Sequence, residues 1–333
     1  SVPDILYRNN GDGTFSESLK QYFGHTSRFS MGSDVADINH DGFMDLITLD
    51  MLPEEEKVLK SSDGDEGLDI LDLRIKKLGY HFQFSRNMLQ INQGGENFLE
   101  TALLSGVAAT DWSWSALFED YNLDGETDLF VFTGIPKRPN NLDYIKYFSN
   151  EEIQKKIDQT NLIDKEALKL MPSGNVKNYI FEGGSGIRFK DQTGNWISND
   201  TLISNGAAYA DFDNDGDLDV ITNNLNRPPT LYKNKGNALG SFLSLQFEYD
   251  KQNVFGIGTK VIAFDQGKKQ VKQLFTTKGF QSSSEPMLHF GFGQAAVIDS
   301  LWVIWPDQTI QKLYNQKTNK KLVVKASNTR EDF

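Results

Sequence analysis

The 333-residue sequence predicts an all-β fold, in which propeller blades are followed by a small β-sandwich or barrel. Three observations lead to this prediction. An acidic nine-residue pattern occurs three times without gaps, an apolar strand-like run follows every copy, and a strand–turn element repeats out of phase with it. Repeated all-β units of this kind are typical of propellers.

The acidic pattern is Asp-x-Asp/Asn-x-Asp-Gly-x-x-Asp, and its copies begin at Asp37, Asp120 and Asp211. Small residues and a short apolar stretch precede each copy. The apolar runs that follow span residues 46–49, 129–132 and 220–222. Each acidic loop is therefore expected to connect two neighbouring strands.

The second repeated element is a strand, then a turn rich in Gly and Asn, then often an aromatic residue. Its copies span residues 5–15, 88–98, 179–189 and 231–236. Asn-Gly and Gly-Gly turns between β-rich runs indicate hairpins. The repeating unit is thus about four strands long, with one acidic loop between two of them.

The acidic loops begin 83 and then 91 residues apart. A blade needs only about 40–50 residues, so each interval carries an insertion. Residues 53–80 and 136–172 have apolar residues at roughly helical spacing, and we expect both insertions to be helical and to cap one face.

Three blades cannot close a ring, because propellers have about 4–8 blades. The prediction is therefore part of a seven-bladed propeller whose remaining blades precede Ser1. Residues 1–238 are assigned to propeller blades, residues 239–327 to a small β-domain and residues 328–333 to a tail. The strand-like runs of the β-domain are 242–249, 258–264, 270–276, 287–290 and 300–305.

The acidic loops have the chemistry of a calcium site. Calcium takes six to eight oxygen ligands in a flexible cage, and acids at positions 1, 3 and 5 of a tight loop converge on one point. Gly at position 6 allows the turn, the carbonyl of position 7 adds a ligand, and the acid at position 9 closes the cage. The predicted ligands of three Ca²⁺ ions are Asp37, Asn39, Asp41, Phe43 and Asp45; Asp120, Asn122, Asp124, Glu126 and Asp128; and Asp211, Asp213, Asp215, Asp217 and Asp219.

Two other cation sites fit less well. An EF-hand needs Glu at position 12 and flanking helices, whereas position 12 here is Thr48, Val131 or Thr222 and the flanks are strand-like. Magnesium resists dehydration and prefers few carboxylates. The third loop offers the most ligand carboxylates, so we predict that it binds calcium most tightly.

The charge balance excludes some partners. The net charge is −12, which disfavours nucleic acid and anionic lipid. Ten carboxylates belong to the predicted calcium ligands, and three bound ions would reduce the charge to −6. The chain has no cysteine and no apolar run of about 18 residues, so disulfides and a membrane-spanning helix are not expected.

At the acidic loops the sequence resembles FG-GAP/VCBS repeats, as in integrin α-subunit propellers and bacterial surface proteins. Residues 256–261, 279–282, 288–293 and 303–307 resemble the ASPIC/UnbV domain that follows such propellers in cartilage acidic protein-like chains. Thr259 and Gln308 depart from that domain, where Ala and Gly are expected. The resemblance implies Ca²⁺ in the loops, and secreted or lipid-anchored, non-catalytic proteins of the bacterial envelope.

The predicted function is therefore a calcium-binding, non-catalytic binding, adhesion or scaffold module. It is expected outside the cell or at its surface, associated with a bacterial outer membrane, with a protein or glycan ligand or as an accessory subunit of an outer-membrane complex. The alternative is a lyase-like, polysaccharide-active enzyme on a calcium-containing propeller. Trp112 and Trp114 face the same way on a predicted strand, either as a sugar-stacking platform or as blade core.

Overall fold

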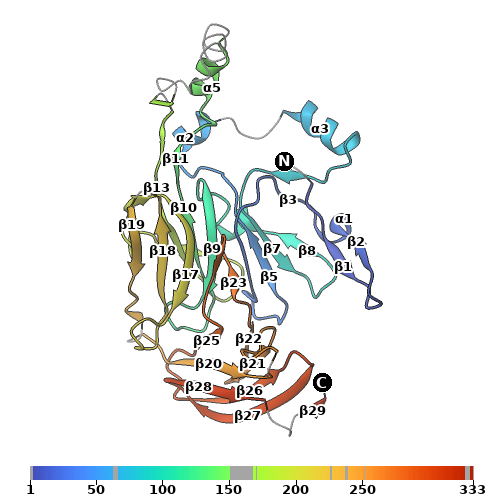
Figure 1. Cartoon of the computed structure of the whole chain (residues 1–333), viewed down its shortest axis with the longest axis vertical. Coiled ribbons are helices and arrows are strands. Elements are labelled where there is room, and N and C mark those ends of the chain that lie inside the picture. The colour runs from blue at the N-terminus through green and yellow to red at the C-terminus, as the bar shows by residue number, and fades with distance from the viewer. Residues whose placement is uncertain are drawn as a thin grey trace.

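The computed structural model describes residues 3–62, 67–150, 168–169, 171–225, 227–236, 239–250, 252–326 and 331–332. The fold is all-β with few helices, as predicted. Figure 1 shows a fan of sheets above and a smaller layered β-domain below.

Three sheets of the fan repeat one antiparallel order, in which each acidic loop connects the first strand to the second. The first blade has β4 (Ser33–Ala36), β5 (Asp45–Thr48), β7 (Met88–Asn92) and β8 (Phe98–Glu100). The second has β9 (Ser113–Glu119), β10 (Asp128–Thr133), β14 (Tyr179–Glu182) and β15 (Lys190–Asp191). The third has β17 (Ser204–Ala210), β18 (Asp219–Asn224) and β19 (Arg227–Tyr232).

The second blade is buried on both faces because successive side chains of a strand point to opposite sides. On β9, Phe118 packs into the core shared with the first blade, and Leu117 packs into the core shared with the third. On β10, Leu129 faces the first of these cores and Phe130 the second. A continuous apolar run such as 129–132 is what a strand covered on both faces requires.

The propeller arrangement is confirmed, but the number of blades is not the seven that was expected. The described residues hold no more than five blades. The reason is the length of the repeats, which take 83 and 91 residues where an uninterrupted blade takes about 40–50.

The insertions are partly helical, as predicted. The first contains α2 (Glu56–Lys60) and α3 (Leu68–Lys76), and the second contains α5 (Leu142–Phe148). These helices lie at the end of the fan opposite the layered domain (Figure 1). Residues 151–167, where the sequence pattern also predicts a helix, lie outside the described residues.

Shorter elements complete the fan. They are β1 (Tyr7–Asn9), β2 (Phe15–Glu17), α1 (Leu19–Tyr22), β3 (Thr26–Ser27), β6 (Gln83–Phe84), α4 (Ala102–Ser105), β11 (Ile135–Lys137), β12 (Ser173–Gly174), β13 (Val176–Lys177) and β16 (Thr201–Leu202). Among the described residues, no helix combines the length and the apolar character that crossing a membrane requires.

The layered domain is a sandwich of two sheets. One has the order β25–β20–β28 and the other β22–β21–β26–β27–β29. Their core contains Trp305, which is fully buried and packs edge-on against Phe247. The strands are β20 (Phe242–Glu248), β21 (Lys260–Asp265), β22 (Lys268–Gln273), β25 (Met287–Gly291), β26 (Val297–Ile304), β27 (Thr309–Lys317), β28 (Lys320–Lys325) and β29 (Glu331–Asp332).

The sequence analysis found five of these eight strands and missed β27, β28 and the two-residue β29. β27 is rich in Lys and Gln, β28 is rich in Lys, and most of the side chains of both strands are half-buried or exposed. Pairing with neighbouring strands sets their positions. For example, β28 runs parallel to β20, which is the central strand of its sheet. Gln308, which stands where the family has Gly, adopts a left-handed φ of 68° in the turn between β26 and β27.

A segment of the sandwich enters the fan. It comprises residues 277–284 with β23 (Thr277–Lys278) and β24 (Ser282–Ser283), and we call it the plug. The plug reaches the first strand of each of the three blades that carry an acidic loop. Its bonds are Gly279 N to Ser33 O (3.1 Å), Phe280 N to Ser115 Oγ (3.1 Å), Ala207 N to Ser282 Oγ (3.1 Å) and Tyr209 N to Ser284 Oγ (3.2 Å). Figure 1 shows β23 between β9 and β5.

Candidate metal centres at the domain interface

The three acidic loops share one backbone conformation. Position 4 is left-handed in each copy, with φ of 59°, 62° and 59° at His40, Leu123 and Asn214. The glycines at position 6 have φ of 99°, 93° and 101°. A non-glycine residue in this region costs energy and persists where the surroundings demand it. The sequence pattern marked the glycine but not position 4, whose three residues share no chemical character.

The carboxylate at position 1 turns back over its own loop. Asp37 Oδ2 accepts the N–H of Gly42 (2.9 Å), and the second and third loops repeat this bond at 2.8 and 3.1 Å. Asp37 Oδ1 is buried and has no hydrogen-bond partner among the described residues. A buried carboxylate oxygen without a partner is costly, and a cation in the loop would satisfy it.

The carboxylate at position 9 ties its loop to the third strand of the blade. Asp45 Oδ2 accepts the N–H of Ile38 (3.0 Å) and its Oδ1 accepts the N–H of Asn92 (2.8 Å). Asp128 Oδ1 accepts from Gly183 (2.8 Å), and Asp219 Oδ1 accepts from Asn234 (2.7 Å). The position-9 carboxylate therefore joins the acidic repeat to the out-of-phase repeat, which explains why the two repeats recur together.

Positions 3, 5 and 7 lie side by side on the outer part of the loop. Asn39 Nδ2 donates to Asp41 Oδ2 (3.0 Å), and the N–H of Phe43 donates to Asp41 Oδ1 (2.8 Å). Asn122, Asp124 and Glu126 repeat these contacts in the second loop. In the third loop the carboxylate oxygens of Asp211, Asp213 and Asp215 lie within 4.8 Å of one another, close enough to share one metal ion.

Burial perturbs the acids that lie deepest in the loops. The pKa of Asp45 is raised to about 7, mainly by burial and to a smaller extent by nearby Asp41 and Asp37. Burial also raises the pKa of Asp120 to about 7, opposed by Lys272, and holds the pKa of Asp128 well above its ordinary value. A bound cation stabilises the ionised form of such carboxylates, so the donor set fits a divalent ion with oxygen ligands.

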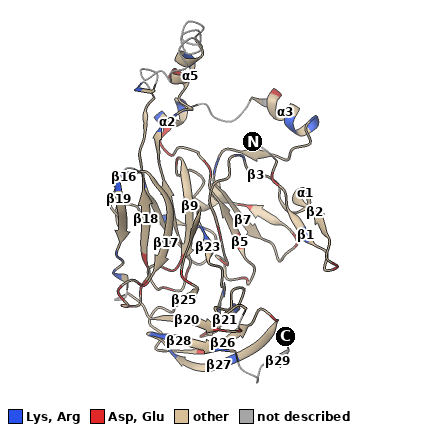
Figure 2. Ribbon diagram, in the orientation of Figure 1, with Lys and Arg blue, Asp and Glu red and all other residues tan. Residues whose placement is uncertain are grey.

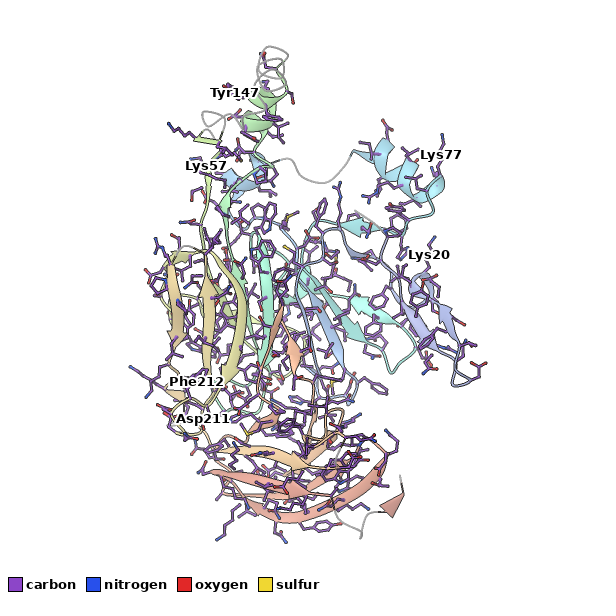
Figure 3. The ribbon with its side chains drawn as sticks, in the orientation of Figure 1. Lys20, Lys57, Lys77, Tyr147, Asp211 and Phe212 are labelled. Carbon is purple, nitrogen blue, oxygen red and sulfur yellow. The ribbon has the colours of Figure 1, made fainter. Side chains whose placement is uncertain are left out.

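All three loops face the β-sandwich. Figure 3 shows Asp211 and Phe212 at the blade end beside the sandwich, with Tyr147 and Lys57 at the opposite end. Acidic segments appear at the same blade ends in Figure 2. The common location follows from the topology, since each loop connects the same two strands of its blade.

The contacts to the first two loops use their outer carbonyls. Lys269 Nζ donates to Asp41 O (2.6 Å) and Lys260 Nζ to Gly42 O (3.5 Å). The N–H of Gly293 donates to Leu123 O (2.8 Å) in the second loop. His40 Nε2 and Glu126 Oε2 lie 2.8 Å apart and connect these two loops.

The third loop rests on an aromatic pair of the sandwich. His289 Nε2 donates to Gly216 O (2.9 Å), and Phe242 stacks on the His289 ring at 5.7 Å. A Cβ on Gly216 would overlap the Phe242 ring. Burial lowers the pKa of His289 to about 4, so the imidazole is neutral at pH 7. Sequence reasoning missed these contacts because they join residues far apart in the chain, 73 positions in the case of His289 and Gly216.

A cluster of buried charges fixes the plug beside the loops. Lys278 Nζ lies 3.4 Å from Asp34 Oδ2 and 3.7 Å from Glu119 Oε1, and Lys272 Nζ lies 2.6 Å from Glu119 Oε2. Burial raises the pKa of Glu119, but Lys272 and Lys278 outweigh it and hold the value at about 2. Tyr209 also contributes a hydrogen bond to Glu119.

The two tryptophans singled out by the sequence belong to the interior. Trp114 is partly buried, donates from Nε1 to Gly134 O (2.7 Å) and packs on Phe280 of the plug at 5.0 Å. Trp112 Nε1 is also buried. This arrangement favours the core interpretation over a sugar-stacking platform.

Residues 3–48, which contain the first acidic loop, match a family model described as FG-GAP-like repeat, and residues 249–331 match the model ASPIC and UnbV. The chain carries an FG-GAP-like repeat and an ASPIC/UnbV domain. The resemblance drawn from the sequence is thereby confirmed. The sandwich that contacts the loops and supplies the plug is the ASPIC/UnbV domain, and neither family is typical of enzymes.

A stretch of 109 residues is 30% identical to cartilage acidic protein 1 of Xenopus tropicalis. It covers 32% of this chain and 16% of the relative. The chain thus matches only a small part of that protein's length.

Proposed function

We propose that the chain is a calcium-binding, non-catalytic binding and scaffold module, in which three Ca²⁺ ions occupy the acidic loops. The observation that carries the proposal is the threefold recurrence of one backbone cage, with its first and ninth carboxylates held by equivalent N–H groups. The fifteen residues at positions 1, 3, 5, 7 and 9 are the ligand set we propose. The third loop is proposed as the tightest site, since three of its acids already converge.

We further propose that the ions stabilise the contact between the blades and the ASPIC/UnbV domain. Each loop presents backbone carbonyls to that domain, so a loop that loses its shape would misplace Asp41 O, Leu123 O and Gly216 O together with their donors. Calcium is thus assigned a structural role at the domain interface in addition to joining strands within a blade.

An extracellular or cell-surface location, associated with a bacterial outer membrane, is part of the proposal. Calcium sites of extracellular modules bind with dissociation constants of about 10⁻⁴–10⁻³ M, which free calcium outside cells can fill. A protein or glycan ligand, or an outer-membrane complex, is the proposed partner. The net charge of −12 argues against nucleic acid.

Calorimetry on protein freed of divalent ions tests the proposal directly. We expect Ca²⁺ to bind at three sites, Mg²⁺ to bind much more weakly, and the melting temperature to rise with calcium. Saturation to 100 times the dissociation constant adds about 2.7 kcal/mol of stability per site. Absence of binding heat, together with an unchanged melting temperature after chelation, would overturn the proposal.

A further inference from the structure

A pocket of about 490 Å³ opens between the second and third blades, next to the second and third acidic loops. Its floor is the core shared by those blades, including Phe130, Ile180 and Val220. The volume lies within the range of sites for small molecules, about 300–1,000 Å³.

One wall of the pocket is aromatic and held in place. The Tyr232 hydroxyl accepts from Asn178 Nδ2 (3.0 Å), and the Tyr232 ring meets Phe130 edge-on at 5.2 Å. Trp196 lines the pocket with 37% of its surface exposed, and its backbone N–H donates to Gln192 O (2.9 Å). A partly exposed aromatic ring offers an apolar face to one side of a flat ligand.

The remaining lining is polar and carries positive charge. Asn122 and Asn195 contribute amides, and Lys233 and Lys235 contribute ammonium groups. Within the described part of the chain, Lys235 forms no salt bridge, whereas Lys233 pairs with Asp213 of the third loop. Asn122 Nδ2 already donates to Asp124 Oδ2 (3.0 Å) and Asn195 Nδ2 to Gln192 Oε1 (2.9 Å), so each amide group has one further N–H to donate to a ligand oxygen. An uncharged ligand would leave Lys235 without a counter-ion.

We propose that this pocket binds an acidic saccharide unit. The sugar ring lies against Trp196, its hydroxyls bond the amides of Asn122 and Asn195, and its carboxylate pairs with Lys235. The proposal rests on the proposed function in one respect: calcium in the third loop engages Asp213, which releases Lys233 to the ligand. The proposal also specifies the glycan partner of the module as an acidic saccharide.

The test uses the full chain and two ligands that differ only at C6, where methyl β-D-glucuronide has a carboxylate and methyl β-D-glucoside has an uncharged hydroxymethyl group. Ligand-observed NMR gives both dissociation constants. We expect the glucuronide to bind about tenfold more tightly, as one charge-assisted hydrogen bond implies. Lys235→Met should remove this preference and leave glucoside binding unchanged, and Trp196→Ala should weaken both ligands about tenfold. Lys190→Met is the matched control, because Lys190 is exposed and pairs with Glu182 outside the pocket.

Calcium separates this proposal from the proposed function. Added calcium should tighten glucuronide binding in the parent chain and not in Lys233→Met. If calorimetry finds no calcium binding while Lys235 and Trp196 still determine saccharide binding, the pocket is supported and the calcium proposal fails. Calcium binding without saccharide binding, or saccharide binding that neither substitution changes, overturns the pocket.

Discussion

Lys278→Met tests whether the plug is anchored by charge. Lys278 lies 3.4 Å from Asp34 and 3.7 Å from Glu119, and the three side chains are 10%, 2% and 7% exposed. At an effective dielectric constant near 20, each attraction is about 5 kcal/mol, opposed by the several kcal/mol needed to bury the ammonium. Glu119 retains Lys272, whereas Asp34 loses its salt-bridge partner. Breaking a buried pair costs about 3–5 kcal/mol, and we expect about 3.

The assay is urea unfolding, followed in parallel by limited proteolysis of the plug. In the double variant Lys278→Met with Asp34→Asn, no unpaired charge remains, and an amide oxygen can still accept the N–H of Phe118 that Asp34 Oδ2 now accepts at 2.8 Å. The double variant should recover at least half of the loss. Lys325→Met is the control, because its pair with Glu248 is exposed and should contribute less than about 1 kcal/mol. A loss below about 1 kcal/mol for Lys278→Met, or additive losses in the double variant, would refute the reasoning.

Three further outcomes follow from the loops and the blades. Asp213→Asn should weaken calorimetric calcium affinity at one site about tenfold, and unchanged affinity would contradict the ranking of the third loop. Gly216→Ala should cost about 3 kcal/mol in thermal unfolding, because the methyl group strains the left-handed backbone and displaces Phe242; Gly267→Ala, where the added methyl meets open space, should cost only about 1. Burial raises the pKa of Glu100, but its histidine and arginine partners outweigh it and lower the value to about 2. Glu100→Gln should therefore cost about 2 kcal/mol at pH 7, and urea midpoints should show this cost disappearing as the pH falls from about 4.5 towards 2.

The repeat allowed the blades and their loops to be predicted, because both are local. A strand followed by a tight acidic turn depends on neighbours within about ten residues, and the three copies begin at Asp37, Asp120 and Asp211. The continuous apolar run after the second copy is consistent with the strand that the structure buries on both faces.

The plug could not be predicted in the same way. The stretch Gly279-Phe280-Gln281-Ser282 carries a family signature, but its bonds go to backbone or hydroxyl groups of Ser33, Ser115 and Ala207. Small polar residues on three separate strands do not indicate, from the sequence alone, that they will hydrogen-bond to the plug. The buried ion pairs around Lys278 could not be predicted either, because a lysine between turn residues is expected to be exposed at the surface.

The strands β27 and β28 were missed for a different reason. A strand with one exposed face alternates polar and apolar residues, and at β27 the polar residues include Gln311, Lys312 and Gln316. Only pairing with β26 and β29 sets the register of β27. Strands whose stability comes from non-local pairing give a weak local pattern.

The contacts of the loops show how domain docking and cation binding can coexist in one place. The lysines of the ASPIC/UnbV domain, Lys260 and Lys269, donate to backbone carbonyls of the first loop and not to its carboxylates. They therefore hold the loop in shape without competing for the groups that would bind a cation. Lys233 is different, because it belongs to the third blade and pairs with the Asp213 carboxylate itself. A cation in the third loop must displace this lysine, whereas a cation in the first loop displaces neither Lys260 nor Lys269. Among the described residues, the third loop is thus the one in which cation binding would break a salt bridge to a ligand carboxylate, and this loop borders the pocket between the blades.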